Sequence, residues 1–89
     1  MHRARVDKNQ KDIVYMLRQY GAVVLHTHTV KNLFDIIVCF KGKTYLVEIK
    51  DGNKPLTEGE LKCKEQVESV GVTYHIVRNI DDALQLLEK

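Results

Sequence analysis

The sequence has no long apolar run, little proline and little net charge, and each of these features excludes a class of protein. No apolar run approaches the roughly 18 residues that a membrane-spanning helix needs, and the basic first residues are not followed by the apolar stretch of a signal peptide. One proline and five glycines in 89 residues argue against a disordered or fibrous chain. With 44% apolar residues, we expect one soluble, cytoplasmic domain over residues 1–89 that does not contact a membrane.

The two cysteines do not form a metal-binding pattern. Cys39 and Cys63 both fall within apolar segments, without a CxxC pair or a third ligand nearby. A structural zinc site needs such ligands. We therefore interpret both cysteines as small buried hydrophobic residues.

Charge is balanced overall but not along the chain. The formal net charge of +2 is too small to indicate nucleic-acid binding by itself. The start of the chain is more basic, because residues 1–11 contain four basic residues, Arg3, Arg5, Lys8 and Lys11, and one acidic residue, Asp7. Residues 1–6, together with Lys8, are a candidate basic arm that lies on phosphates, and a solvated, frayed terminus is the alternative.

Three segments have the apolar spacing and caps of helices. The first helical segment ends at Gly21, because glycine readily adopts the left-handed backbone conformation that terminates many helices. The predicted helices are a segment capped by Asp7 that buries Ile13, Met16, Leu17 and Tyr20; Glu58–Val70, opened by a Thr57–Glu60 capping box, with an apolar stripe of Cys63, Val67 and Val70; and a segment capped by Asp81 that carries Ala83, Leu84 and Leu87.

Four segments are rich in β-branched and aromatic residues, as strands are. Two of them flank Lys41-Gly42 and are apolar almost throughout, which predicts a hairpin inside the sheet. The helix before the last strand permits a crossover to a parallel neighbour. The prediction is an α/β fold of order α-β-β-β-α-β-α, with a mixed central sheet flanked by helices. The predicted strands are Ala22–Thr29, Leu33–Phe40, Thr44–Lys50 and Val72–Val77.

Three charged residues interrupt the apolar hairpin: Asp35, Glu48 and Lys50. Burying an unpaired ion costs several kcal/mol or more, so these positions point to a special role. Glu48 and Lys50 are two residues apart and share one face of a strand. If Lys41-Gly42 forms a two-residue turn, Asp35 lies opposite Glu48, with Cβ atoms about 5 Å apart.

Two neighbouring carboxylates on buried strands repel each other, and a divalent cation would remove this repulsion. Carboxylate oxygens in this arrangement suit Mg²⁺ or Mn²⁺. A lysine beside such an ion is a suitable arrangement for phosphodiester hydrolysis. The alternative is a structural salt bridge between Lys50 and either Asp35 or Glu48.

The same residues resemble the active-site signature of the PD-(D/E)xK nucleases, in which an Asp, a hydrophobic hairpin and Glu-x-Lys follow one another. Here the signature is Phe34-Asp35-Ile36-Ile37 and Val47-Glu48-Ile49-Lys50. With further motif matches, the segment from about Asp7 to Leu87 resembles the VRR-NUC family. This family includes the nuclease domain of the Fanconi-associated nuclease and small standalone proteins found largely in phages. These further matches are Asp7–Val14, Leu56–Glu60 and Gly71-Val72.

The resemblance implies a metal-dependent endonuclease with a restriction-endonuclease-like core that acts on branched DNA, as in DNA repair. Standalone members look like homodimeric resolvases of four-way junctions, and a phage-encoded one would act in the host cytoplasm. By resemblance, Asp35, Glu48 and the Ile49 carbonyl bind the metal, and Lys50 is the catalytic lysine. Asp12, on the first helix, assists the metal directly or through water.

The sequence departs from the family pattern at three positions. Phe34 replaces a Pro, which affects how the strand is entered, and Asp12 replaces a longer Glu. Glu60 stands where Gln is common and adds repulsion near the metal, unless its capping-box role holds it away from the site.

Other polar residues have weaker signals. Lys31 and Lys54 flank the predicted site in loops and are candidates for phosphate contacts, although surface lysines usually have no specific partner. His26 and His28 share a strand face without a third ligand, so a role facing a partner or a phosphate is favoured over metal binding.

Two other functions remain open at this point. A nucleic-acid-binding module that retains the nuclease fold without catalysis is favoured by the departures at Asp12 and Glu60. A protein-interaction domain would show no affinity for DNA even at low salt.

Overall fold

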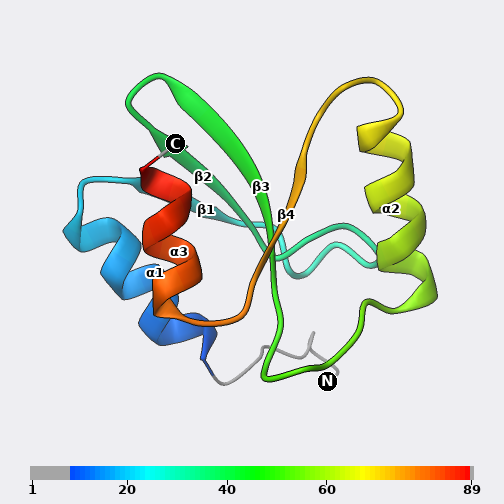
Figure 1. Ribbon diagram of the computed structural model, residues 1–89, viewed down its shortest axis with the longest axis horizontal. Coiled ribbons are helices and arrows are strands. Elements are labelled where there is room, and N and C mark those ends of the chain that lie inside the picture. The colour runs from blue at the N-terminus through cyan, green and yellow to red at the C-terminus, as the bar shows by residue number, and fades with distance from the viewer. Residues whose placement is uncertain (1–8, 89) are drawn as a thin grey trace.

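The computed structural model describes residues 9–88, which form an α/β fold (Figure 1). The predicted order α-β-β-β-α-β-α is confirmed. The candidate basic arm, with Arg3, Arg5 and the adjoining Lys8, lies outside the described residues. The elements are α1 (Gln10–Gln19), β1 (Val23–His26), β2 (Ile36–Phe40), β3 (Lys43–Ile49), α2 (Glu58–Glu68), β4 (Tyr74–Val77) and α3 (Ile80–Leu87).

The strands form one mixed sheet in the order β1-β2-β3-β4. β1, β2 and β3 are antiparallel neighbours, whereas β4 pairs with β3 in parallel. The connection from β3 to β4 passes through α2, as a parallel pair requires. β2 and β3 therefore occupy the interior of the sheet, which explains why both are apolar along most of their length.

The β2–β3 hairpin has the predicted register. Its turn consists of Lys41 and Gly42, both with positive φ (49° and 79°), as a tight two-residue hairpin turn requires. Ile36 pairs with Val47 at the open end of the ladder. Asp35, the residue before Ile36, donates its N–H to the Val47 carbonyl (3.0 Å). The predicted direct pair of Asp35 with Glu48 is therefore not part of the ladder, although the two residues lie close enough for their charges to interact.

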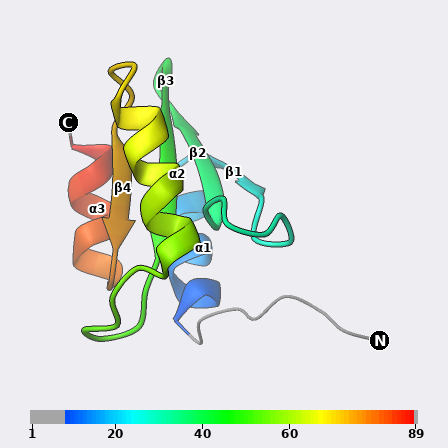
Figure 2. The same ribbon diagram turned by 90° about the vertical axis from the view of Figure 1, so that its right-hand side faces the viewer.

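Helices cover both faces of the sheet (Figures 1 and 2). α1 and α3 pack on one face, where Ile13, Leu17 and Leu86 belong to the larger apolar cluster. α2 packs on the other face, in a smaller cluster that contains Cys63 and Tyr74. In Figure 2, α2 stands in front of the sheet and α1 lies behind it. The sheet therefore separates a large apolar core from a smaller one.

The first helix differs from its prediction at both ends. The predicted cap, Asp7, lies outside the described residues, and Asn9 precedes the helix without a side-chain capping bond. Tyr20, predicted on the buried face, follows the last helical residue and is exposed. Val14 is buried instead, because the face that packs against β1 and α3 is set by tertiary contacts.

The other helices also begin or end at different residues. α2 ends at Glu68, so Val70, predicted in its apolar stripe, is 78% exposed. α3 is capped by the Asn79 side chain, which accepts from the Asp82 N–H (2.8 Å). Asp81, the predicted cap, lies in the first turn instead.

The two cysteines are free thiols, and Cys63 is buried as predicted, whereas Cys39 is only half-buried. Cys39 lies near the hairpin turn on the same face of β2 as Ile37, which packs in the smaller apolar cluster. Within residues 9–88, no helix has the length and apolar character needed to cross a membrane.

Candidate active site

Asp35 lies immediately before β2 and is tied to β3 by two hydrogen bonds. Its N–H donates to the Val47 carbonyl (3.0 Å), and its Oδ2 accepts from the Ile49 N–H (2.8 Å). Val47 and Ile49 flank Glu48, so Asp35 is anchored beside that residue. The Asp35 carbonyl accepts from the Thr27 N–H on the other side (2.8 Å), so Asp35 is held between β3 and the residue that follows β1.

Glu48 and Lys50 lie on the α2 face, at the end of β3. Leu46, two residues earlier, packs in the apolar cluster under α2, and alternate strand residues share a face. Lys50 Nζ lies 3.6 Å from Glu48 Oε2, and only 3% of Glu48 and 9% of Lys50 is exposed. The two side chains therefore share one buried face, as predicted, although Lys50 follows the strand rather than ending it.

Glu60 reaches the same place from the first turn of α2. Its Oε1 accepts from the Thr57 N–H (2.9 Å) and lies 2.8 Å from Lys50 Nζ. Thr57 Oγ1 accepts from the Glu60 N–H (3.2 Å), which completes the predicted capping box. The capping role does not hold Glu60 away from the site, because the oxygen that caps the helix also binds Lys50. We refer to Asp35, Glu48, Lys50 and Glu60 as the acidic cluster.

The charges of the acidic cluster are strongly coupled. Burial raises the pKa of Glu48 to about 9, with further contributions from the negative charges of Asp35 and Glu60, while Lys50 acts in the opposite direction. Burial also acts to raise the pKa of Glu60, but hydrogen bonds from Lys50 and Thr57 outweigh it and lower that pKa. Glu48 therefore keeps its proton at neutral pH in the absence of a metal, chiefly because its carboxyl is buried.

The cluster fits a hard divalent cation. Asp35 and Glu48 offer carboxylate oxygens, and Mg²⁺ typically uses only one or two carboxylates and keeps several waters. The Ile49 N–H donates to Asp35 Oδ2 (2.8 Å), so the Ile49 peptide lies beside the Asp35 carboxylate, where its carbonyl remains a candidate metal ligand. Among residues 9–88, no three His, Cys, Asp or Glu side chains form a ready-made metal cage, so water would supply the remaining ligands.

Asp12 is not part of the acidic cluster. It lies on α1, which covers the opposite face of the sheet from α2 (Figure 1). It borders a hollow shared with Asp51, Arg78 and Asp81. Asp12 lies at the edge of the apolar stripe of α1, so the sequence allowed it to be either near the charged face of the sheet or away from it. The packing of α1 against β1 and α3 places it away from the acidic cluster.

The two candidate lysines lie in loops that adjoin elements of the cluster. Lys31 is exposed in the β1–β2 loop, which lies so close to the first turn of α2 that a Cβ at Gly59 would clash with the Asn32 side chain. Lys54 is exposed in the loop after β3. Arg78 Nη1 holds that loop by donating to the Lys54 carbonyl (2.8 Å). Both lysines remain candidates for phosphate contacts.

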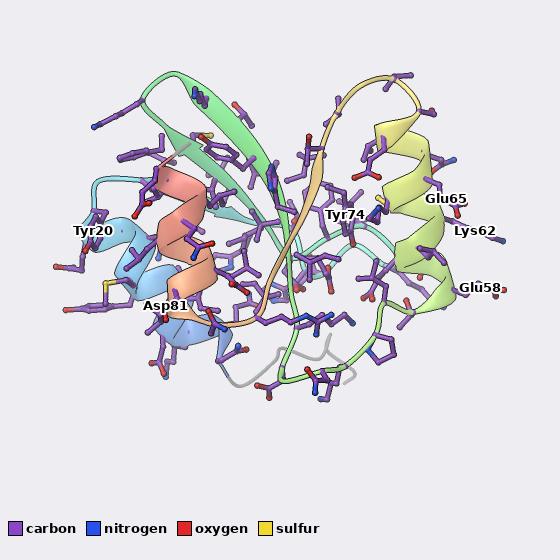
Figure 3. The ribbon with its side chains drawn as sticks, in the orientation of Figure 1. Tyr20, Glu58, Lys62, Glu65, Tyr74 and Asp81 are labelled. Carbon is purple, nitrogen blue, oxygen red and sulfur yellow. The ribbon has the colours of Figure 1, made fainter. Side chains whose placement is uncertain are left out.

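Tyr74 on β4 is a neighbour of the cluster that the sequence did not single out. Its side chain lies between β4 and α2 (Figure 3), and its hydroxyl donates to the Leu33 carbonyl (3.2 Å). Burial, followed by the negative charges of Glu48 and Glu60, raises the pKa of the phenol. No spacing in the sequence signals this contact, because β4 reaches β3 only through long-range parallel pairing.

Comparison with known proteins does not assign a family. No protein-family model matches this chain, and no curated protein matches it significantly. The similarity to the VRR-NUC family therefore remains a prediction from the motif residues. What the fold adds is that Asp35, Glu48 and Lys50, which are separated in the sequence, lie together in space.

Proposed function

We propose that this protein is a metal-dependent, structure-specific endonuclease that hydrolyses phosphodiesters in branched DNA. The supporting observation is the convergence of two carboxylates and one ammonium, from Asp35, Glu48 and Lys50, at the open end of an apolar hairpin. Such a group is costly to bury, which favours a role in binding or catalysis over a role in stability. The order of elements and the hairpin register agree with the VRR-NUC resemblance.

Each residue has a distinct role in the proposed reaction. Asp35, Glu48 and the Ile49 carbonyl would hold Mg²⁺ or Mn²⁺, which lowers the pKa of bound water and offsets charge on the phosphate. Asp35 is oriented for this role because its Oδ2 is fixed by the Ile49 N–H. Lys50 donates hydrogen bonds to a phosphate oxygen or to the attacking water.

Glu60 positions Lys50 in this proposal. The 2.8 Å contact between Glu60 Oε1 and Lys50 Nζ fixes the end of a flexible side chain. An ammonium has three N–H donors, so this contact leaves Lys50 able to bind phosphate. Asp12, on the other face of the sheet, would act on the metal only indirectly.

A homodimer is part of the proposal, because a four-way junction needs paired cuts and a two-fold dimer supplies two related sites. β1 is an edge strand, and Val23 and Leu25 on it are 55% and 51% exposed. Exposed apolar side chains on a sheet edge are typical of a surface that pairs with another chain.

A second candidate is a nucleic-acid-binding module without catalysis. The observation that favours it is the ion pair between Lys50 and Glu60, which neutralises the cation that catalysis requires. Such a module would bind branched DNA in EDTA and leave it intact with either metal.

The test is incubation of the protein with a labelled four-way junction and Mg²⁺, Mn²⁺ or EDTA. We expect metal-dependent cleavage, and a loss of about a hundredfold or more in Lys50→Ala and Asp35→Asn. Asparagine retains an oxygen that can accept from the Ile49 N–H, so Asp35→Asn should fold normally.

Matched controls are Lys62→Ala and Asp81→Asn, which change exposed residues away from the acidic cluster (Figure 3). Both should cleave as the unaltered protein does. Cleavage that survives Lys50→Ala or Asp35→Asn would overturn the assignment, and metal-independent binding without any cut would establish the module instead. Sedimentation with and without the junction tests the dimer.

A further inference from the structure

A basic hollow lies between α1 and β1, apart from the acidic cluster. It has a volume of about 670 Å³, and its polar walls come from Lys11, Tyr15 and Arg18 on α1, from His26 at the end of β1 and from His28 in the loop that follows. Ligand sites in proteins commonly have volumes of about 300–1,000 Å³. Among the described residues that line it, none is acidic, so the hollow favours an anionic ligand.

Exposed aromatic rings accompany these positive charges. Tyr15 is 64% exposed, although a ring of this size is usually buried. His26 and His28 stand edge to face, with ring centroids 5.6 Å apart. Burial, followed by the charges of Arg18 and His28, lowers the pKa of His26, so its ring is neutral at neutral pH and can stack on another ring.

Two polar atoms at the hollow lack partners. Gln10 Oε1 and His28 Nδ1 are buried, and within the described part of the chain neither has a hydrogen-bond partner. Buried polar atoms are nearly always paired in native proteins. Gln10 and His28 both line the hollow, so a bound molecule could supply the missing partners.

The hollow is also connected to the acidic cluster through the backbone. Thr27, between the two histidines, donates its N–H to the Asp35 carbonyl (2.8 Å) and its hydroxyl to the Phe34 carbonyl (2.7 Å). The end of β1 that carries the histidines is therefore fixed to the segment that carries Asp35. The hollow opens on the α1 face of the sheet and the acidic cluster lies on the α2 face, so a strand that contacts both would pass around β1, which is an edge strand.

We infer that this hollow binds a single-stranded segment of nucleic acid, with bases stacked on Tyr15 and His26 and phosphates bound by Lys11 and Arg18. Cations combined with exposed aromatic rings are the usual means by which proteins hold single strands without sequence preference. The inference rests on the proposed function and deepens it, because it assigns an unpaired segment to the branched substrate.

The experiment measures fluorescence anisotropy of a labelled oligo(dT) of about ten nucleotides in EDTA, so that no cleavage contributes. We expect Tyr15→Ala to weaken binding about tenfold or more, and Tyr15→Phe, which keeps the ring, to bind like the unaltered protein. Tyr20→Ala is the matched control, because Tyr20 is 56% exposed just after the far end of the same helix (Figure 3) but does not line the hollow.

The salt dependence tests the phosphate contacts. Lys11→Gln should lower the slope of log affinity against log salt by about 1, whereas Lys62→Gln, on the outer side of α2 (Figure 3), should leave it unchanged. Competition with free thymidine monophosphate separates a mononucleotide pocket from a strand-binding site, since a strand that spans the hollow should bind far more tightly than the monomer.

Equal affinity of Tyr15→Ala and the unaltered protein would overturn the inference, as would a duplex that binds through Tyr15 as tightly as the single strand. The result is independent of cleavage. Tyr15-dependent binding without junction cleavage would refute the proposed nuclease activity and support the strand-binding hollow. Junction cleavage with unchanged affinity in Tyr15→Ala would support the nuclease activity and refute the hollow.

Discussion

The two faces of the sheet are built for different purposes. Beneath α1 and α3, fully buried side chains such as Ile13, Leu17 and Val47 form a large apolar core. Beneath α2, the apolar cluster is smaller and adjoins the buried charges of Glu48 and Lys50. Apolar burial stabilises a fold, whereas the burial of charge costs free energy. The face under α1 and α3 therefore provides most of the stability, and the face under α2 carries the buried charges that reduce it.

The largest effect should come from breaking the apolar face. Leu17 is completely buried, so Leu17→Ala should lower the free energy of unfolding by about 2–5 kcal/mol. Urea denaturation measures this. Leu61→Ala removes an exposed leucine of α2 and should change stability by less than about 0.5 kcal/mol. Similar losses for the two variants would mean that the α1–α3 face is not the main core.

A smaller effect should come from removing the buried carboxyl of the α2 face. The pKa of Glu48 is raised in the folded protein, so the folded state binds a proton that the unfolded state has lost. Without metal, stability should therefore fall as pH rises from the unfolded pKa of 4.5 through about 9. Between about pH 6 and 8.5 the loss is up to about 3 kcal/mol.

Glu48→Gln should remove most of this pH dependence and stabilise the metal-free protein at about pH 8.5. Urea denaturation in EDTA at the two pH values checks it. Glu58→Gln changes an exposed glutamate of the same region (Figure 3) and serves as the control. An unchanged pH profile in Glu48→Gln would show that Glu48 is ionised in the folded protein.

A third effect concerns the cap that links α2 to the acidic cluster. Thr57→Ala removes the hydroxyl that accepts from the Glu60 N–H and should cost about 1 kcal/mol. Thr57→Ser keeps the hydroxyl and should restore stability. If Glu60 positions Lys50 as proposed, Thr57→Ala should also reduce junction cleavage, and a stability loss without any change in cleavage would separate the cap from the site.

The smallest effect should come from an ion pair on the surface. Lys64 Nζ lies 2.8 Å from Glu68 Oε1 on the partly exposed side of α2. Exposed pairs contribute little because water screens them, so Lys64→Met should not change the thermal midpoint measurably. A clear drop would show that α2 depends on surface charge more than on the cluster beneath it.

The hairpin site was predictable because local rules define it. Lys41-Gly42 allows a two-residue turn, and that turn sets the register up to the Ile36–Val47 pair. Asp35 comes next and reaches β3 through its bond from the Ile49 N–H. The alternation of strand residues then places Lys50 on the same face. None of these steps needs information from a distant part of the chain.

Other parts of the site depended on distant contacts. The Thr57–Glu60 capping box was predictable from the sequence. The approach of Glu60 to Lys50 was not, because it requires α2 to lie over the end of β3. Tyr74 reaches the cluster only because β4 pairs with β3 in parallel. The placement of Asp12 depended on which face of the sheet α1 covers.

The sequence by itself determined the element order, the hairpin register and the shared face of Glu48 and Lys50, because short-range sterics and side-chain periodicity fix them. Tertiary structure alone decided which helix lies over the carboxylates, where Asp12 is placed and how the basic hollow forms between α1 and β1. Those outcomes depend on how apolar faces pack across the sheet. Helix periodicity shows which side of a helix is apolar, but it does not show which surface of the sheet that side packs against.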